Sequence, residues 1–405
     1  MRAVVALLLL SGASLDAGDL VLTGATVYSA PEAPAIVGAA VVVHDGKIGA
    51  AGPRASARIP RDFQVIDCSG KFITAGFWNS HVHVFTPGLL HAREAKAAEL
   101  SGELDAMLNR WGFTTVFDIA SVLDNTLALR RRIASGEVRG PRILTVGEPL
   151  WTKPPIYVID FLAANRLEMP AVTTPEEAAA RVRDLAPRGV DGIKLFTGSY
   201  QGGSVDNMPV GMVRAAADEA HRHRLPVFAH PQNLAGMETA IDGGVDILAH
   251  TVPESPPWTP EFVARLNGAH MALIPTLTLF DFEARKAGIK EDDREGWLTK
   301  MAGELRAFSQ GEGEVLFGTD VGYTDHYDTA MEYSLMSRAG MTFSQILASL
   351  TTAPAQRFGA SAHAGRIAPG MDADLVVLDR DPAKDITALS KVHMVIRAGT
   401  ILYKQ

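Results

Sequence analysis

Short runs of β-branched residues separated by turns occupy both ends of the chain. Examples are LVLTGATVYS (20–29), AAVVVHDGKIGAAG (39–52) and KVHMVIRAGTILYK (391–404). Asp45-Gly46 and Ala398-Gly399 stand between such runs, where they predict tight turns of hairpins. We therefore expect residues 19–69 and 364–405 to form one small β-sandwich domain, which the chain leaves and re-enters.

The central segment, 70–363, repeats the order apolar strand, polar loop, helix. Amphipathic periodicity predicts helices such as Pro175–Leu185, Val210–His223 and Pro260–Asn267. The expected strands are Phe77–Val84, Thr114–Ile119, Arg142–Val146, Gly192–Phe196, Pro226–His230, Asp246–His250, Met271–Thr276 and Val315–Asp320. Strands alternating with helices over this length predict an α/β fold, a (β/α)8 TIM-like barrel. An open doubly wound sheet is the alternative, but no G-x-G-x-x-G follows an early strand.

The first residues, 1–17, carry one arginine, an apolar run and small residues, which is typical of a signal peptide. The run is too short to span a bilayer, which takes roughly 20 apolar residues. A signal predicts a periplasmic or secreted protein without a membrane span after its removal. A buried N-terminal strand or an over-extended start codon is the alternative and would leave the protein in the cytoplasm.

Composition narrows the class of protein. Of 405 residues, 47% are hydrophobic and 21% charged, which indicates a globular chain with a large core. The net charge of -8 argues against nucleic acid as a partner, because phosphate binding needs a clustered positive field. Cys68 is the single cysteine, so an intramolecular disulfide is excluded. We expect a small molecule as the partner; a homo-oligomer remains open.

Polar residues that suit a metal close several of the predicted strands. The stretch GFWNSHVHVF (76–85) places two histidines on one face of a strand, because alternate side chains share a face. A barrel brings the carboxyl ends of its strands to one mouth. The residues expected there are His81, His83, Lys194, His230, His250 and Asp320.

Each of these residues has a structural alternative when it is taken alone. A strand-end histidine is often hydrogen-bonded in the core, and Asp320 could cap the following helix. Their coincidence at matching positions of several strands favours a shared site. Imidazole and carboxylate together suit zinc, iron or manganese rather than calcium.

At these residues the chain resembles the amidohydrolase superfamily of metal-dependent hydrolases. The similarity runs from Leu20 to Lys404 and rests on VIDCSGKFITAGFWNSHVH, IKLF, VFAH, ILAH, FGTD, LTTAPAQRFG and GRIAPGMDADLVVLD. The subgroup it resembles contains imidazolonepropionase-like and Xaa-Pro-dipeptidase-like enzymes, which hydrolyse amide bonds of small molecules.

The resemblance implies two divalent metal ions, with Zn²⁺ expected, bridged by a carbamylated Lys194. His81, His83 and Asp320 would then hold one ion, and His230 and His250 the other. Burial of the Lys194 amine agrees with this, because burial favours the neutral form that reacts with CO2. The expected mechanism is attack by a metal-bridging hydroxide, with Asp320 as general base and then general acid.

Substrate choice is expected to come from the loops after the strands. Tyr200, His326 and Tyr327 are the candidate substrate-binding residues. The favoured substrate is a dipeptide or an N-acyl amino acid. Two other enzymes remain open: a mononuclear hydrolase of cyclic amides, which would leave Lys194 unexplained, and a lactonase or organophosphate hydrolase with the same centre. A metal-free scaffold protein is disfavoured because every ligand position is filled.

Overall fold

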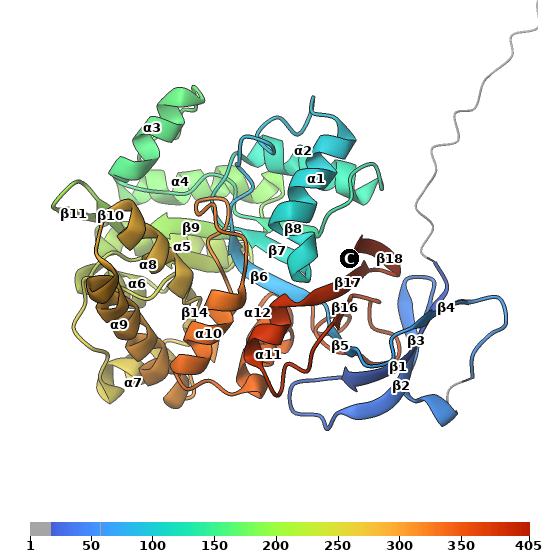
Figure 1. Cartoon of the computed structure of the whole chain (residues 1–405). Coiled ribbons are helices and arrows are strands. Elements are labelled where there is room, and N and C mark those ends of the chain that lie inside the picture. The colour runs from blue at the N-terminus through green and yellow to red at the C-terminus, as the bar shows by residue number, and fades with distance from the viewer. Residues whose placement is uncertain (1–17, 57) are drawn as a thin grey trace, which may run out of the picture.

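The computed structural model describes residues 18–56 and 58–405. These residues form an α/β fold in which a small sheet built from both chain ends lies beside a larger body of helices and parallel strands (Figure 1). The predicted signal peptide, 1–17, lies outside the described residues. Within the described part of the chain, no helix is long and apolar enough to cross a membrane.

The small sheet contains strands from both ends of the chain, in the order β18-β17-β16-β5-β1-β2-β3, with β4 paired to β1. Their bounds are β1 (Leu20–Tyr28), β2 (Ile36–His44), β3 (Lys47–Pro53), β4 (Gln64–Asp67), β5 (Phe72–Ala75), β16 (Leu375–Leu378), β17 (Val392–Arg397) and β18 (Thr400–Lys404). The sheet thus continues past residue 69 to β5.

Both predicted hairpin turns are present. Asp45 and Gly46 have φ of 49° and 71°, and Ala398 and Gly399 have φ of 46° and 77°. Two successive residues with positive φ match the right-handed twist of the flanking strands, which is why such turns close hairpins. Ala373, just before β16, links the two turns: its amide donates to the Gly46 carbonyl at 2.9 Å, and its carbonyl accepts from the Gly399 amide at 3.2 Å.

The strands of the small domain form one hydrogen-bonded sheet, and its two ends pack on the same apolar core. Leu22, Val41 and Val43 come from one end of the sheet, and Met394 and Ile396 from the other. A single curled sheet can bury one face in this way. The sequence predicted a β-sandwich, whereas these strands form a single hydrogen-bonded sheet with one apolar core.

The larger body contains parallel strands in two sheets, β6-β7-β8 and β15-β14-β13-β12-β9. Their bounds are β6 (Phe77–Val82), β7 (Phe113–Asp118), β8 (Arg142–Thr145), β9 (Ile193–Phe196), β12 (Val227–His230), β13 (Ile247–Leu248), β14 (Ala272–Leu273) and β15 (Glu314–Val315). Each lies within or beside a predicted strand. A short hairpin, β10 (Gly198–Tyr200) with β11 (Val205–Asn207), follows β9.

Backbone contacts join the two parallel sheets at both edges. Leu150, after β8, forms a parallel bridge with Leu195 of β9, and Val82 of β6 forms one with Val321, after β15. The strands follow one another in chain order without the reversal that marks a doubly wound sheet. The predicted α/β class is therefore confirmed.

Helices separate the parallel strands (Figure 1). Predicted Pro175–Leu185 matches α4, and the other two predicted helices match α5 and α7 to within one residue. The helices are α1 (Ala97–Met107), α2 (Leu123–Ala134), α3 (Ile156–Ala164), α4 (Pro175–Leu185), α5 (Val210–Arg222), α6 (Leu234–Asp242), α7 (Pro260–Gly268), α8 (Leu277–Lys286), α9 (Glu291–Gln310), α10 (Ala330–Arg338), α11 (Phe343–Leu350) and α12 (Thr352–Arg357). The 3-10 turns are η1 (Arg54–Ser56), η2 (Asn109–Trp111), η3 (Ala186–Arg188) and η4 (Ile386–Ser390).

Candidate metal centre

The six polar residues predicted from the strand ends line one pocket. This ligand set comprises His81, His83, Lys194, His230, His250 and Asp320. His81 belongs to β6, Lys194 to β9 and His230 to β12, whereas His83, His250 and Asp320 follow β6, β13 and β15. Strands on both parallel sheets therefore deliver these side chains to the same place.

His81, His83 and Asp320 lie closest together. The Asp320 Oδ1 atom is 3.2 Å from His81 Nε2 and 2.8 Å from His83 Nε2. On the other side of each ring, Nδ1 lies 3.0 Å from the Ala249 carbonyl and 2.8 Å from the Ala120 carbonyl. A carbonyl only accepts, so Nδ1 donates its hydrogen there and a neutral ring turns an unprotonated Nε2 towards Asp320.

This donor set fits a metal ion. Two ring nitrogens with lone pairs and one carboxylate oxygen converge within 4.8 Å of one another. Asp320 Oδ1 is buried and forms no hydrogen bond of acceptable geometry, although two nitrogens are near. Three such groups facing one another in a buried site need a positive charge between them, which a proton on one ring or a metal ion supplies. Imidazole held through its other nitrogen is the usual form of a metal ligand.

His230 and His250 extend this cluster to a second position. The ring centroids of His81 and His250 are 4.6 Å apart, and those of His230 and His250 are also 4.6 Å apart. His250 Nδ1 lies 2.8 Å from the Thr276 hydroxyl, which fixes the direction of the ring. Burial lowers the pKa of His230 to about 3, with Lys194 adding to the effect, so this imidazole is neutral and able to bind a metal.

Lys194 is a buried amine without a counterion. Its side chain is 1% exposed, and among the described residues its Nζ forms no hydrogen bond or ion pair; it lies 5.7 Å from the Phe196 ring centroid. Burial lowers the pKa of Lys194 to about 7, although Asp320 acts in the opposite direction. A substantial fraction of the amine is therefore neutral and nucleophilic near pH 7.

Asp320 has an unusual backbone for a residue with a side chain. Its φ is 60°, in the left-handed region, and its amide donates to the His81 carbonyl at 2.9 Å. Such strained backbone persists where surrounding contacts hold it and is common at functional sites. Burial alone would raise the pKa of Asp320, but His81 and His83 outweigh it and keep that pKa well below its usual value. Asp320 is thus an ionised carboxylate.

The ligand set forms the floor of a cavity of about 820 Å³. Helix α3, from the loop after β8, supplies one wall through Tyr157, Val158, Phe161 and Leu162, which we call the α3 face. The Tyr157 hydroxyl lies 3.4 Å from His230 Nε2, so this wall reaches the floor. Leu279 and Phe280 of α8 also line the cavity.

The predicted substrate residues have different positions. Tyr200 lines the cavity, whereas His326 is exposed and Tyr327 packs against the core, and neither belongs to the cavity wall. Tyr323, from the same loop, does line it. The α3 face was not predicted from sequence. Its signal was the run IYVIDFLAA (156–164), a helix-length apolar stretch after two prolines in a loop.

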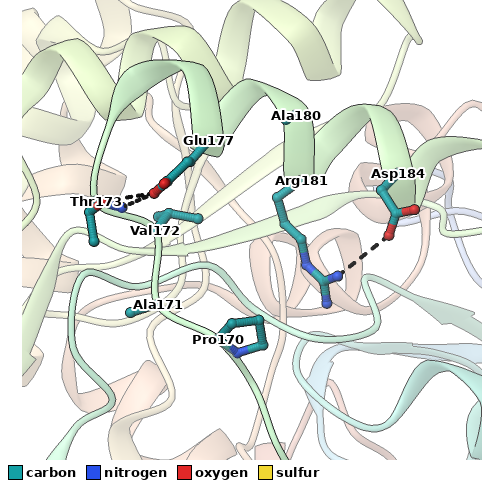
Figure 2. A pocket seen from close by; sticks show the side chains of 8 residues that line it. All are labelled: Pro170, Ala171, Val172, Thr173, Glu177, Ala180, Arg181 and Asp184. Carbon is teal, nitrogen blue, oxygen red and sulfur yellow. Dashed lines mark hydrogen bonds and ion pairs between the residues drawn. The ribbon is translucent and has the colours of Figure 1, made fainter.

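A second cleft, of about 390 Å³, lies on the outside of α4 (Figure 2). Its charged side chains are already engaged. Glu177 accepts hydrogen bonds from the Thr173 amide and hydroxyl, both at 2.7 Å, and Arg181 pairs with Asp184 at 3.4 Å. This cleft therefore offers no free group for chemistry.

The chain belongs to the amidohydrolase family. The model of that family, described as "Amidohydrolase family", matches residues 72–402. This match spans the ligand set and most of the strands that carry it, so the resemblance inferred from the strand-end motifs is confirmed.

Individual relatives agree with this family. The chain is similar to a candidate prolidase from Bifidobacterium longum, with 27% identity, a TM-score of 0.80 and coverage of 96% of this chain and 95% of that one. The fold also matches a Xaa-Pro dipeptidase with bound methionine in the active site, at 22% identity and a TM-score of 0.81, over 96% of this chain and 100% of that one. An adenine deaminase of Rubrobacter xylanophilus is 24% identical over 95% of this chain; the chain spans 57% of its length.

Proposed function

We propose that this protein is a metal-dependent hydrolase of an amide bond in a small molecule. The observation that carries the proposal is the buried Asp320 Oδ1, which faces the Nε2 atoms of His81 and His83 at 3.2 and 2.8 Å without a hydrogen bond. Membership of the amidohydrolase family supports it. The edge contacts between the two parallel sheets support a (β/α)8 barrel, whose strand ends are the usual place for such a centre.

Two divalent ions fit the residues present, and Zn²⁺ suits their imidazole and carboxylate donors. His81, His83 and Asp320 would hold one ion, His230 and His250 the other, and a carbamylated Lys194 both. Carbamylation joins the neutral Lys194 amine to CO2 with loss of a proton, and it turns the unpaired buried amine into an anion. Bound metals supply Lewis acidity and lower the pKa of water from 15.7 towards about 7.

The residues of the chain account for the proton transfers. Asp320 accepts a proton from the attacking water and delivers it to the amide nitrogen as the C–N bond breaks, giving a carboxylate and an amine. Its ionised carboxylate is suited to the first of these steps. Tyr157 covers His230 from the α3 face and helps to keep bulk water from the centre.

Two classes of amide are candidate substrates for this centre. The first is the class predicted from sequence, a dipeptide or an N-acyl amino acid. Both predicted compounds carry a free carboxylate beside the amide. The 27% identity to a candidate prolidase supports that class. The second class is an amide without a carboxylate, which the apolar and acidic lining of the cavity favours.

Metal stoichiometry tests the proposed centre. Protein purified with zinc and bicarbonate should contain about two metal ions per chain, and Lys194→Ala should lower that number. Lys153→Ala is the matched control, because Lys153 is an exposed lysine outside the ligand set and should leave the metal content unchanged. One metal per chain, unaffected by Lys194→Ala, would instead support the mononuclear hydrolase of cyclic amides.

A further inference from the structure

The α3 face is an apolar surface that the protein itself does not bury. Helix α3 has the sequence IYVIDFLAA, yet none of its residues is buried. Tyr157, Val158, Phe161 and Leu162 recur at helical spacing, so they share one side of the helix, and all four line the cavity. Figure 1 shows α3 projecting from the rest of the fold. A helix normally packs such an apolar side against a core, whereas here that side lines the cavity.

Aromatic rings connect this wall to the metal centre. Phe161 lies 4.8 Å from Phe85, and Phe85 lies 5.0 Å from His83, between ring centroids. The ring centroids of Tyr157 and Tyr323, which also lines the cavity, are 5.5 Å apart. An apolar group on a substrate would therefore contact aromatic carbon from the outer wall down to the metal ligands, which is the lining that favours apolar ligands.

The charges around the same cavity are acidic. Apart from the ligand set, the charged residues that line it are Glu254 and Glu283. Lys286 and Lys300 do not line the cavity but contact residues that do, and both are engaged. Lys286 Nζ is 3.8 Å from Glu283 Oε1 and 3.3 Å from the Tyr323 hydroxyl, and Lys300 donates to the Pro253 carbonyl.

Away from the ligand set, a substrate carboxylate would thus meet no unengaged cationic side chain among the described residues that line the cavity. Glu283 is itself held in place, because the Tyr323 hydroxyl donates to its Oε1 at 2.6 Å. A substrate carboxylate would be repelled by the Glu283 carboxylate. This repulsion grows where apolar walls exclude water. The apolar α3 face and the two acidic side chains, Glu254 and Glu283, therefore both disfavour a substrate carboxylate.

From these contacts we propose that the site takes amides whose larger arm is apolar, preferably aromatic, and carries no carboxylate. The inference rests on the proposed amide hydrolysis and narrows its substrate class. It replaces the dipeptides and N-acyl amino acids expected from sequence with neutral N-acyl amines. Specificity comes from the α3 face and from Glu283, whereas the reaction takes place at the ligand set.

A matched pair of substrates tests the proposal with the zinc-loaded full chain. N-hexanoylphenethylamine and N-hexanoylphenylalanine differ only by the carboxylate. We expect kcat/KM to be at least about tenfold higher for the phenethylamine compound, because it brings no negative charge to the acidic lining. Equal values, or a preference for the phenylalanine compound, would overturn the inference while leaving amide hydrolysis intact.

Glu283→Gln sharpens the test. Glutamine keeps an oxygen for the Tyr323 hydroxyl but removes the negative charge, so the tenfold ratio should fall several-fold. Glu291→Gln is the control, because Glu291 is 89% exposed on α9 and should leave the ratio unchanged. If the phenylalanine compound is preferred and Lys286→Met abolishes that preference, Lys286 is a carboxylate anchor and the proposal is wrong.

A binding measurement separates this inference from the proposed function. Ketone analogues, in which CH2 replaces the amide NH, resist hydrolysis, and Trp151 and Trp297 line the cavity as fluorescent reporters. If neither amide is cleaved but the neutral ketone binds more tightly than its carboxylate counterpart, the selectivity stands and amide hydrolysis fails. Tighter binding of the carboxylate ketone would refute the selectivity whether or not amides are cleaved.

Discussion

The floor and the α3 wall of the cavity are held in place by different means. The ligand set stands on or directly after parallel strands, and its rings are fixed by backbone carbonyls and a hydroxyl, as at His81, His83 and His250. The α3 face belongs to an inserted helix with no buried residue. Backbone ladders position groups that must meet a metal within tenths of an ångström, whereas an apolar wall needs only area and shape.

Replacing Asp320 should produce the largest change in kcat. It should also distinguish the role of the ligand set in the reaction from the role of the α3 face in substrate binding. Asn has the shape of Asp but cannot act as a base, so we expect Asp320→Asn to lower kcat for N-hexanoylphenethylamine by about 10²–10⁴-fold. The KM should change little, because the α3 face is untouched, and metal content should fall less than the rate. Equal losses of metal and rate would identify Asp320 as a ligand only.

Glu332 tests the support of α8, which contributes Leu279 and Phe280 to the cavity lining. Its carboxylate is fully buried and accepts hydrogen bonds at 2.7–2.8 Å from the amides of Leu277 and Thr278 and from the Thr278 hydroxyl, at the start of α8. Glu332→Ala leaves these donors unpaired, so the free energy of unfolding should fall by about 3 kcal/mol. Urea unfolding measures this, with the exposed Glu291→Ala as the control that should change little.

The same residue predicts how stability depends on pH. Burial raises the pKa of Glu332 from 4.5 to about 7, although its hydrogen bonds act against this. Between these values the folded state retains a proton that the unfolded state has lost. Stability therefore falls as pH rises through this window, by at most about 1.4 kcal/mol per pH unit from this group. Glu332→Gln should flatten the fall in urea unfolding between pH 5 and pH 7; an unchanged slope would assign it to other groups.

The floor could be predicted from the sequence because its signal is periodic. His81 and His83 share a strand face, and His230, His250 and Asp320 each close an apolar run, so strand order alone brings them together. The strand order therefore predicts that the six residues of the ligand set lie close together, although they are far apart in sequence. Their distances could not be predicted, and neither could the left-handed backbone of Asp320, because both depend on how the strands pack.

The α3 wall was missed for a related physical reason. In IYVIDFLAA the apolar residues run almost continuously, and only Asp160 is charged, so the sequence shows no amphipathic period. Loops after barrel strands also vary in path, and an inserted helix has no neighbour in sequence that fixes its position. His326 and Tyr327 follow Tyr323 in the same loop, but only Gly322 and Tyr323 of that turn line the cavity, because the loop path cannot be read from sequence.

The smallest expected effect compares the two sides of α3. Phe161 lines the cavity, whereas Ile159, on the same helix, is 45% exposed and does not line it. Phe161→Ala should raise the KM for N-hexanoylphenethylamine about fivefold with kcat nearly unchanged, which corresponds to about 1 kcal/mol for a partly buried ring. Ile159→Ala should leave KM unchanged, and steady-state kinetics on both variants measures the difference.

A truncated substrate completes this comparison. N-acetylmethylamine presents the amide without an apolar arm, so Phe161→Ala should not alter its kcat/KM if the wall acts only by contact with that arm. A loss of rate on this small amide as well would mean that Phe161 supports the metal centre through Phe85 and His83, whose rings continue the same stack. Phe161 would then contribute to the support of the ligand set as well as to substrate binding.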